Sequence, residues 1–109
     1  MKHITIIGSG FAGLSAAAYM AKEGHKVTVI EKNEQAGGRA RSFEAAGFTF
    51  DMGPSWYWMP DIFESFFQDF GKKPNDFYQL IRLDPSYQVL WEDLQLPLPA
   101  NFNELKAVF

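Results

Sequence analysis

The sequence of 109 residues predicts an α/β fold that begins with a parallel βαβ unit. "HITIIG" and "KVTVIE" are short apolar and β-branched stretches typical of strands, and the segment between them is rich in Ala, Leu and Met, which favour a helix. Because such a crossover is almost always right-handed, the turn after the first strand lies at the carboxyl ends of both strands. The aromatic-rich remainder predicts the start of a second, α+β domain.

The two elements that open the βαβ unit have distinct patterns. The first strand is almost continuously apolar, so we expect it to be buried on both faces of a sheet. The helix is predicted over residues 11–23, with Gly24 as its stop signal. A face of small residues at helical spacing should lie close against the sheet, and it consists of Leu14, Ala17, Ala18 and Ala21.

A secretory signal is the alternative interpretation of this N-terminal segment. A basic start precedes the apolar run, and the small residues Ala16 and Ala18 resemble a cleavage site. Three glycines inside the run argue against this, since each weakens a continuous helix by about 1 kcal/mol. A signal peptide also does not predict the second strand. We therefore favour the βαβ unit.

The turn after the first strand carries the spacing Gly8-x-Gly10-x-x-Gly13. Gly8 allows the tight turn, Gly10 lets a pyrophosphate approach the backbone, and Gly13 lets the helix pack on the strand. Glu31 ends the second strand, where a carboxylate accepts hydrogen bonds from both ribose hydroxyls and repels a 2′-phosphate, which disfavours NADP. The alternatives are glycines that serve only the turn, and a solvated Glu31.

A second glycine segment follows, where a plain NAD domain would place another helix. Gly37 and Gly38 supply a flexible backbone, and Arg39 supplies donors matched to phosphate, so the segment suits a long, extended dinucleotide. An ordinary loop with a surface arginine is the alternative. A hairpin is predicted next, with strands at residues 43–45 and 48–50.

The rest of the chain is unusually aromatic, with eleven Phe in the whole sequence. A helix is predicted from Pro60 to a stop at Gly71, with an apolar stripe of Ile62, Phe63, Phe66, Phe67 and Phe70. The loop Trp56, Tyr57, Trp58 and Met59 either lines a pocket for a long lipophilic substrate or packs on further parts of the protein. "FYQLIRL", "SYQVLWED" and "LQLPLP" predict short strands, and Asn101 with Glu104 predicts a capped last helix.

Composition excludes several classes of function. The net charge is −3 with scattered Lys and Arg, so we expect no nucleic-acid partner. The chain has no Cys, and His3 and His25 form no ligand pair, so no metal site is predicted. No apolar run reaches the ~18 residues of a membrane span. We expect a cytoplasmic location, with peripheral membrane contact as an alternative.

These motifs, together with Asp51-x-Gly53-Pro54, resemble the N-terminus of FAD-dependent phytoene desaturases and carotenoid isomerases, which are amine-oxidase-like flavoproteins. In that family the first motif grips the FAD diphosphate and adenosine ribose, the second contacts the diphosphate and ribityl region, and the third lies near the isoalloxazine. The resemblance is close to about residue 55 and looser beyond it. The candidate cofactor-binding residues are Gly8, Gly10, Phe11, Ala12, Gly13, Glu31, Lys32, Gly38, Arg39, Gly53, Pro54 and Ser55. No catalytic residue can be named.

The resemblance implies an N-terminal fragment of an FAD-dependent oxidoreductase that desaturates or isomerises a polyene such as phytoene. Residues 1–55 would begin its FAD-binding domain and residues 56–109 a truncated substrate-binding domain, with the remainder of the chain as a partner. The last helix stops at Phe109 without a C-cap, which also suggests a fragment that is inactive alone. The alternatives are another amine-oxidase-like enzyme acting on an amine or porphyrinogen, and a non-enzymatic relative like the GDP-dissociation inhibitors.

Overall fold

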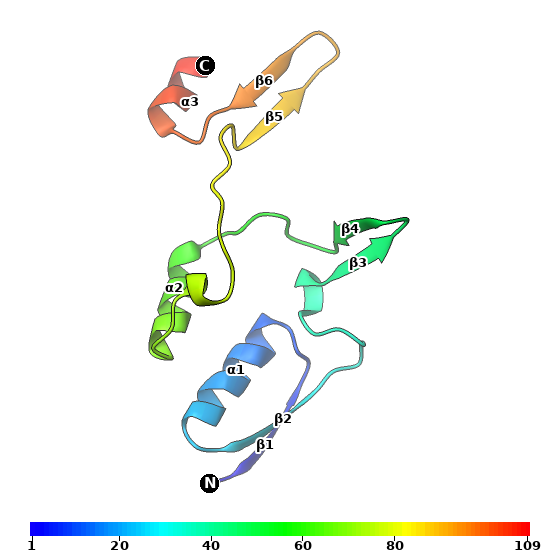
Figure 1. The fold of residues 1–109 in the computed structure, drawn as a ribbon, viewed down its shortest axis with the longest axis vertical. Helices are drawn as coiled ribbons and strands as arrows, with labels where there is room; N and C mark the ends of the chain where they lie inside the picture. Colours follow the sequence, from blue (N-terminus) through cyan, green and yellow to red (C-terminus); the bar gives the residue numbers. More distant parts are fainter. The chain divides into compact units, whose positions relative to one another are not determined.

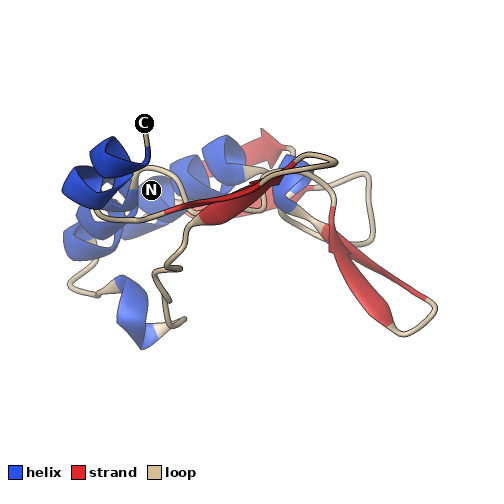
Figure 2. Cartoon of the chain, turned by 90° about the horizontal axis from the view of Figure 1, so that it is seen from above, coloured by secondary structure: helices blue, strands red, loops and turns tan.

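The computed structural model describes residues 1–109, which form two compact units, Met1–Trp58 and Met59–Phe109 (Figure 1). The chain contains three two-stranded sheets, whose strands and helices are distinguished by colour in Figure 2. Every strand pairs with a strand of its own unit. The domain boundary expected from the sequence, between residues 55 and 56, stays a prediction.

The first unit opens with β1 (His3–Ile7), α1 (Phe11–Lys22) and β2 (Lys26–Ile30). The strands pair in parallel, from His3 beside Lys26 to Ile7 beside Ile30. The helix ends where the Gly24 N–H donates to the carbonyl of Ala21, with Gly24 at a φ of +79° that glycine adopts readily. The predicted α/β class and its βαβ unit are confirmed.

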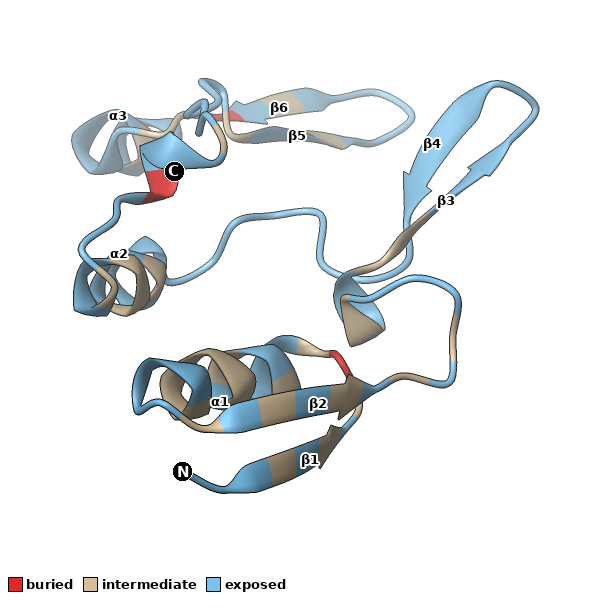
Figure 3. Cartoon of the chain, turned by 60° about the horizontal axis from the view of Figure 1, so that its bottom comes forward, coloured by how far each residue is buried: buried red, intermediate tan, exposed pale blue.

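Only one face of this sheet is covered. Half-buried residues alternate with exposed ones along both strands, as the banded colouring of Figure 3 shows. Ile7 is 88% exposed and Ile30 is 54% exposed, so the expectation that the first strand is buried on both faces is wrong for this chain. The reason is that one helix can cover only one side of a two-stranded sheet.

The packing face of α1 also differs from the prediction. Ala17 and Ala18 are half-buried, but Leu14 and Ala21 are exposed. Gly13 sets the closest approach instead, because its missing side chain lets the helix lie directly against the carbonyl of Gly8. The prediction that the helix lies close to the sheet is therefore correct, but only two of the four residues named for the contact face are half-buried.

The predicted hairpin is confirmed. After the 3₁₀ turn η1 (Gly38–Ala40), β3 (Ser42–Ala45) and β4 (Phe48–Asp51) pair antiparallel. Ala46 and Gly47 join them with φ values of +52° and +80°, which the right-handed twist of a two-residue hairpin turn requires. The rings of Phe43 and Phe50 stack across the strands at 5.1 Å.

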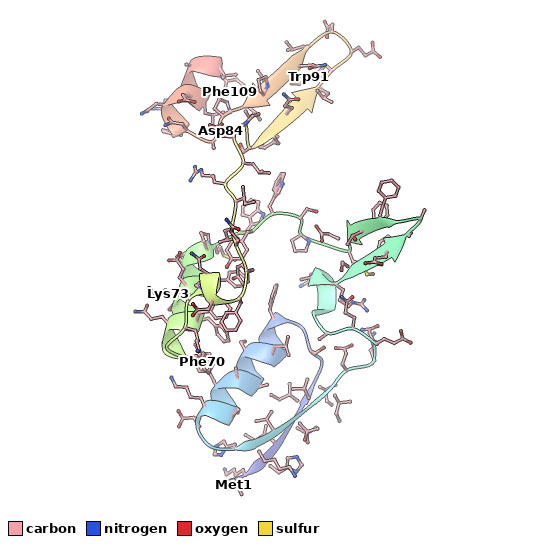
Figure 4. All side chains as sticks on the ribbon, in the orientation of Figure 1. Met1, Phe70, Lys73, Asp84, Trp91 and Phe109 are labelled. Atoms are coloured by element: carbon pink, nitrogen blue, oxygen red, sulfur yellow. The ribbon has the colours of Figure 1, made fainter.

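The second unit begins with α2 (Pro60–Asp69) and the 3₁₀ turn η2 (Pro74–Asp76), and the predicted helix is confirmed. Aromatic side chains gather between these two elements, with Phe70 labelled in Figure 4. Phe67 stacks on Phe77 at 4.9 Å, and Phe66 contacts Phe70 at 5.0 Å. Ile62 is 56% exposed and so lies outside the packed part of the predicted stripe.

The strand predicted for "FYQLIRL" is wrong, because residues 77–83 form no strand. The N–H groups of Phe77 and Tyr78 donate to the carbonyl of Pro74, which folds the start of this segment onto η2. The segment therefore begins in a turn, although its apolar and aromatic residues favour an extended conformation.

The last elements confirm the other predictions for this region. β5 (Tyr87–Leu90) and β6 (Gln95–Leu98) pair antiparallel, and α3 (Phe102–Val108) follows. Asn101 caps α3 by accepting hydrogen bonds from the N–H groups of Asn103 and Glu104. No helix of the chain has both the length and the apolar character that crossing a membrane demands.

Candidate functional site

The glycine turn between β1 and α1 contains two positions at which the fold itself requires glycine. Gly8 has a φ of +96° and donates its N–H to the carbonyl of Ile30 at 2.7 Å. A Cβ on Gly13 would lie 2.1 Å from the carbonyl oxygen of Gly8. The tight turn and the helix–strand contact expected of these residues are therefore present in the structure.

Gly10 differs from its two neighbours in the motif. Its φ of −75° suits any residue, and a Cβ there would meet only the Cα of Gly38 at 3.8 Å, an ordinary contact. The local fold therefore leaves room for an alanine at this position. A ligand that approaches the backbone would explain the glycine better than packing does.

The second glycine segment lies directly against the first. Gly37 donates its N–H to the carbonyl of Ser9 at 2.8 Å. Gly38 has a φ of +61°, and a Cβ on it would lie 3.0 Å from the Cα of Gly10. The two segments are thus adjacent walls of one site, although they are separate in the sequence.

The third segment joins the same assembly through Arg39. A Cβ on Gly53 would lie 2.1 Å from the carbonyl oxygen of Arg39, so these two backbones touch. Three predicted segments therefore meet in a series of glycine contacts, each between backbones rather than side chains. Such contacts leave the N–H and carbonyl groups of the turns close to whatever binds there.

The end of α1 that faces this turn is suited to an anion. Gly10 caps the helix without a side-chain hydrogen bond, and the first turn contains no acidic residue. The partial positive charge of the helix N-terminus is therefore not offset by a carboxylate within that turn. Together with the glycine backbone, it forms a surface that fits a diphosphate.

Glu31 follows β2 and lies at the centre of a hydrogen-bond network. Its Oε2 accepts from the N–H of Ser9 at 2.8 Å and from the Ser9 hydroxyl at 2.7 Å. Its Oε1 accepts from the N–H of Asn33 at 3.0 Å and from Asn33 Nδ2 at 2.6 Å. The carboxylate thus ties the end of the second strand to the glycine turn after the first.

The same donors determine the charge of this carboxylate. Hydrogen bonds from the backbone and hydroxyl of Ser9, followed by those from Asn33, lower the pKa of Glu31 from 4.5 to about 2. Partial burial opposes this shift but does not outweigh the donors. Glu31 is therefore an anion at any physiological pH, and both of its oxygens already accept hydrogen bonds from the protein.

The other candidate residues are placed less tightly. Phe11 and Ala12 are exposed at the start of α1, beside the glycine turn. The side chain of Arg39 is exposed in η1. The structure does not bring Lys32, Pro54 or Ser55 into the glycine contacts, and all three are exposed. Their roles stay predictions.

Three residues of the site were missed from the sequence. Ser9, at 4% exposed, is the buried polar residue between two glycines, and Asn33 completes the Glu31 network. Arg41 donates from Nε to the carbonyl of Gly38 at 2.8 Å and so supports the second turn. A hydroxyl between Gly8 and Gly10 was the available signal, but its partner is visible only in three dimensions.

Comparison with known proteins bears on this geometry. Residues 6–72 match the model of the NAD(P)-binding Rossmann-like domain family. The chain belongs to that family. The βαβ interpretation of the N-terminal segment is thereby supported over the secretory one, and a dinucleotide is the class of cofactor that the glycine turns fit.

The relatives carry desaturase names. The chain is 58% identical to a carotenoid 3,4-desaturase of Haloarcula japonica, over 97% of this chain and 22% of that protein. It is 41% identical to a 4,4′-diapophytoene desaturase of Staphylococcus aureus strain Newman, over 96% of this chain and 21% of that protein. The predicted resemblance to carotenoid-modifying desaturases is confirmed, and the chain spans about a fifth of the length of these relatives.

A solved structure shares the fold. A crystal structure of a protein from Pyrococcus furiosus matches with a TM-score of 0.60 and 26% identity, over 89% of this chain and 24% of that protein. The likeness shows that most of this chain has a fold that also occurs in a solved structure.

Proposed function

We propose that the chain forms part of the FAD site of an oxidoreductase that desaturates or isomerises a carotenoid precursor such as phytoene. The observation that supports this most directly is the meeting of three glycine segments beside a charged Glu31. The names of the desaturase relatives supply the reaction class. When bound, FAD supplies the hydride or electron chemistry of such a reaction.

The residues of the chain divide the binding of FAD among them. Glu31 accepts hydrogen bonds from the adenosine ribose, and its charge disfavours a 2′-phosphate. The Gly10 backbone and the N-terminus of α1 face the diphosphate. The second turn, at Gly38 and Arg39, adds a further wall of backbone against Gly10, which favours an extended dinucleotide such as FAD over NAD.

The substrate side of the proposal rests on the aromatic residues. Trp56 and Trp58 lie 6.3 Å apart by ring centroids and are 58% and 64% exposed, so they offer apolar surface for a polyene. Further parts of the same polypeptide are the proposed partner that completes the enclosure of such a substrate. The proposed location is the cytoplasm, with peripheral membrane contact for access to a lipophilic substrate.

The test uses the full-length protein that contains this chain. We expect it to purify yellow, to release FAD on denaturation and to lengthen the conjugated system of phytoene, measured as a shift of polyene absorbance to longer wavelength. A colourless protein would contradict the FAD assignment and favour a role like that of the GDP-dissociation inhibitors. A yellow protein that oxidises an amine or porphyrinogen and leaves phytoene unchanged would contradict the substrate.

A further inference from the structure

The Glu31 carboxylate has no acceptor capacity left over. It accepts four hydrogen bonds, two at each oxygen, with donor–acceptor distances between 2.6 and 3.0 Å. An ionised carboxylate offers about four lone-pair sites. A ribose diol that donates two more hydrogen bonds must therefore displace two of the present donors.

The four donors are not equally easy to displace. Two are the backbone N–H groups of Ser9 and Asn33, whose positions are set by the chain. The backbone of Ser9 is fixed further because its carbonyl accepts the N–H of Gly37 at 2.8 Å. The other two donors are the Ser9 hydroxyl and the Asn33 carboxamide, which move by rotation of single bonds. They also serve opposite oxygens of the carboxylate, as the two hydroxyls of a diol would.

We propose that the Ser9 hydroxyl and the Asn33 carboxamide are placeholders, which hold Glu31 while the site is empty and rotate away when the two ribose hydroxyls donate in their stead. This inference rests on the proposed dinucleotide site. The placeholders keep the carboxylate oriented and charged before the ligand arrives, which reduces the reorganisation that binding demands. In return, binding replaces existing hydrogen bonds instead of adding new ones.

The exchange predicts that losing a side-chain donor raises the affinity for the ligand, whereas the loss of a hydrogen-bonding residue usually lowers it. Removing a placeholder leaves the free carboxylate with an unfilled acceptor site but leaves the bound complex unchanged. Affinity for a ribose diol therefore rises when Ser9 or Asn33 loses its side-chain donor. Discrimination against a 2′-deoxyribose also widens in the variant that lacks the placeholder for the 2′-hydroxyl, because no protein donor then remains to fill the place of the missing hydroxyl.

The experiment measures binding of ADP and of 2′-deoxy-ADP to the flavin-stripped full-length protein by calorimetry. The variants are Ser9→Ala, Asn33→Ala and the double variant. The control is Ser15→Ala, whose hydroxyl donates to the carbonyl of Ala12 within α1 and does not touch Glu31. We expect ADP to bind about three- to tenfold more tightly to each single variant, the range for one net hydrogen bond. The ratio of the two affinities should rise in one single variant and equally in the double variant, and stay at the wild-type value in the other single variant.

The outcomes separate the two levels of the proposal. Weaker or unchanged ADP binding by the variants would show that the side chains stay bonded to Glu31 in the complex, and would overturn the placeholders. Should Ser9→Ala not fold, Asn33→Ala tests the same exchange at the other carboxylate oxygen. Failure of the wild-type protein to bind ADP at all would instead contradict the proposed dinucleotide site.

Discussion

The two units of the chain hold their segments together by different means. In Met1–Trp58 the key contacts join backbones at glycines and a carboxylate to four donors. In Met59–Phe109 the contacts between α2 and the segment that follows it join aromatic rings, such as Phe67 and Phe77. Backbone contacts are intolerant of any added atom, whereas ring contacts weaken gradually as apolar area is lost. Substitutions in the full-length protein can test this contrast.

The largest effect is expected at Gly13. In Gly13→Ala the new Cβ meets the Gly8 carbonyl oxygen, so α1 must move away from β1. We expect a loss of at least about 3 kcal/mol in the free energy of unfolding, or no soluble protein, measured by chemical denaturation. The control is Gly71→Ala in the second unit, where a Cβ meets open space and the φ of +67° costs about 1 kcal/mol. Equal losses of unfolding free energy in Gly13→Ala and Gly71→Ala would show that the backbone contact at Gly13 has no special effect on stability.

The next largest effect is expected at Gly10, where a substitution should weaken FAD binding and leave the stability of the fold unchanged. Gly10→Val should block the approach of a diphosphate to the backbone and give protein without FAD, measured by absorbance. Gly10→Ala separates packing from binding, because its Cβ makes only a 3.8 Å contact with Gly38. We expect the alanine variant to unfold at the same denaturant concentration as the wild type and to bind FAD more weakly. Stoichiometric flavin in the valine variant would show that this turn is not the diphosphate site.

A smaller effect is expected at Glu31. Glu31→Ala removes the acceptor of the ribose hydroxyls and should weaken FAD binding by roughly tenfold or more, measured by fluorescence titration. Glu31→Gln keeps the shape but loses the charge, and is expected to fall between the alanine variant and the wild type. An unchanged dissociation constant in both variants would refute the assignment of the ribose to this carboxylate.

The pH dependence follows from the same residue. Because the pKa of Glu31 falls from 4.5 to about 2 on folding, its charge stabilises the folded state above pH 4.5. That contribution is lost as the pH falls from 4.5 to about 2. We expect Glu31→Gln to flatten the acid limb of the unfolding curve, followed by circular dichroism. A limb of the same slope in both proteins would argue against the four-donor network.

The smallest effect is expected in the second unit. Phe67→Ala removes a half-buried ring that stacks on Phe77, so we expect a loss of about 1–3 kcal/mol in the free energy of unfolding. Phe67→Leu keeps apolar area and should recover part of the loss. Such a graded response is the counterpart of the abrupt one expected at Gly13. Equal losses in the leucine and alanine variants would show that the stacked geometry, not the buried area, decides the contact.

The elements set by local pattern were predictable from the sequence. β1, α1 and β2 follow from apolar periodicity and glycine stops, and the spacing of Gly8, Gly10 and Gly13 identified the turn. The segment at residues 77–83 was not, because apolar and aromatic composition indicates surface to bury but not a partner strand. The exposed face of the β1–β2 sheet was not predicted for a similar reason, because an apolar strand sequence does not show which elements cover it.

The candidate site was predictable as a set of segments but not as a network. Glycine and carboxylate positions indicated a dinucleotide, since each follows from the chemistry of one residue type. The bonds from Ser9 and Asn33 to Glu31 depend on how the strand ends meet, which no local pattern encodes. Residues whose role depends on hydrogen bonds between segments distant in the sequence are therefore the ones that cannot be predicted from the sequence.

The contacts at Gly13 and Gly53 also shape how the gene for this protein can change. Any substitution at either position adds the same first atom, a Cβ that would lie 2.1 Å from a backbone carbonyl oxygen. Alanine is therefore nearly as harmful there as tryptophan, and the usual ranking of replacements by size has no meaning. No other amino acid lacks a Cβ, so selection is expected to remove every missense mutation at these two codons. A mutational scan of the chain should show both positions as uniform losses, beside aromatic positions with a graded response.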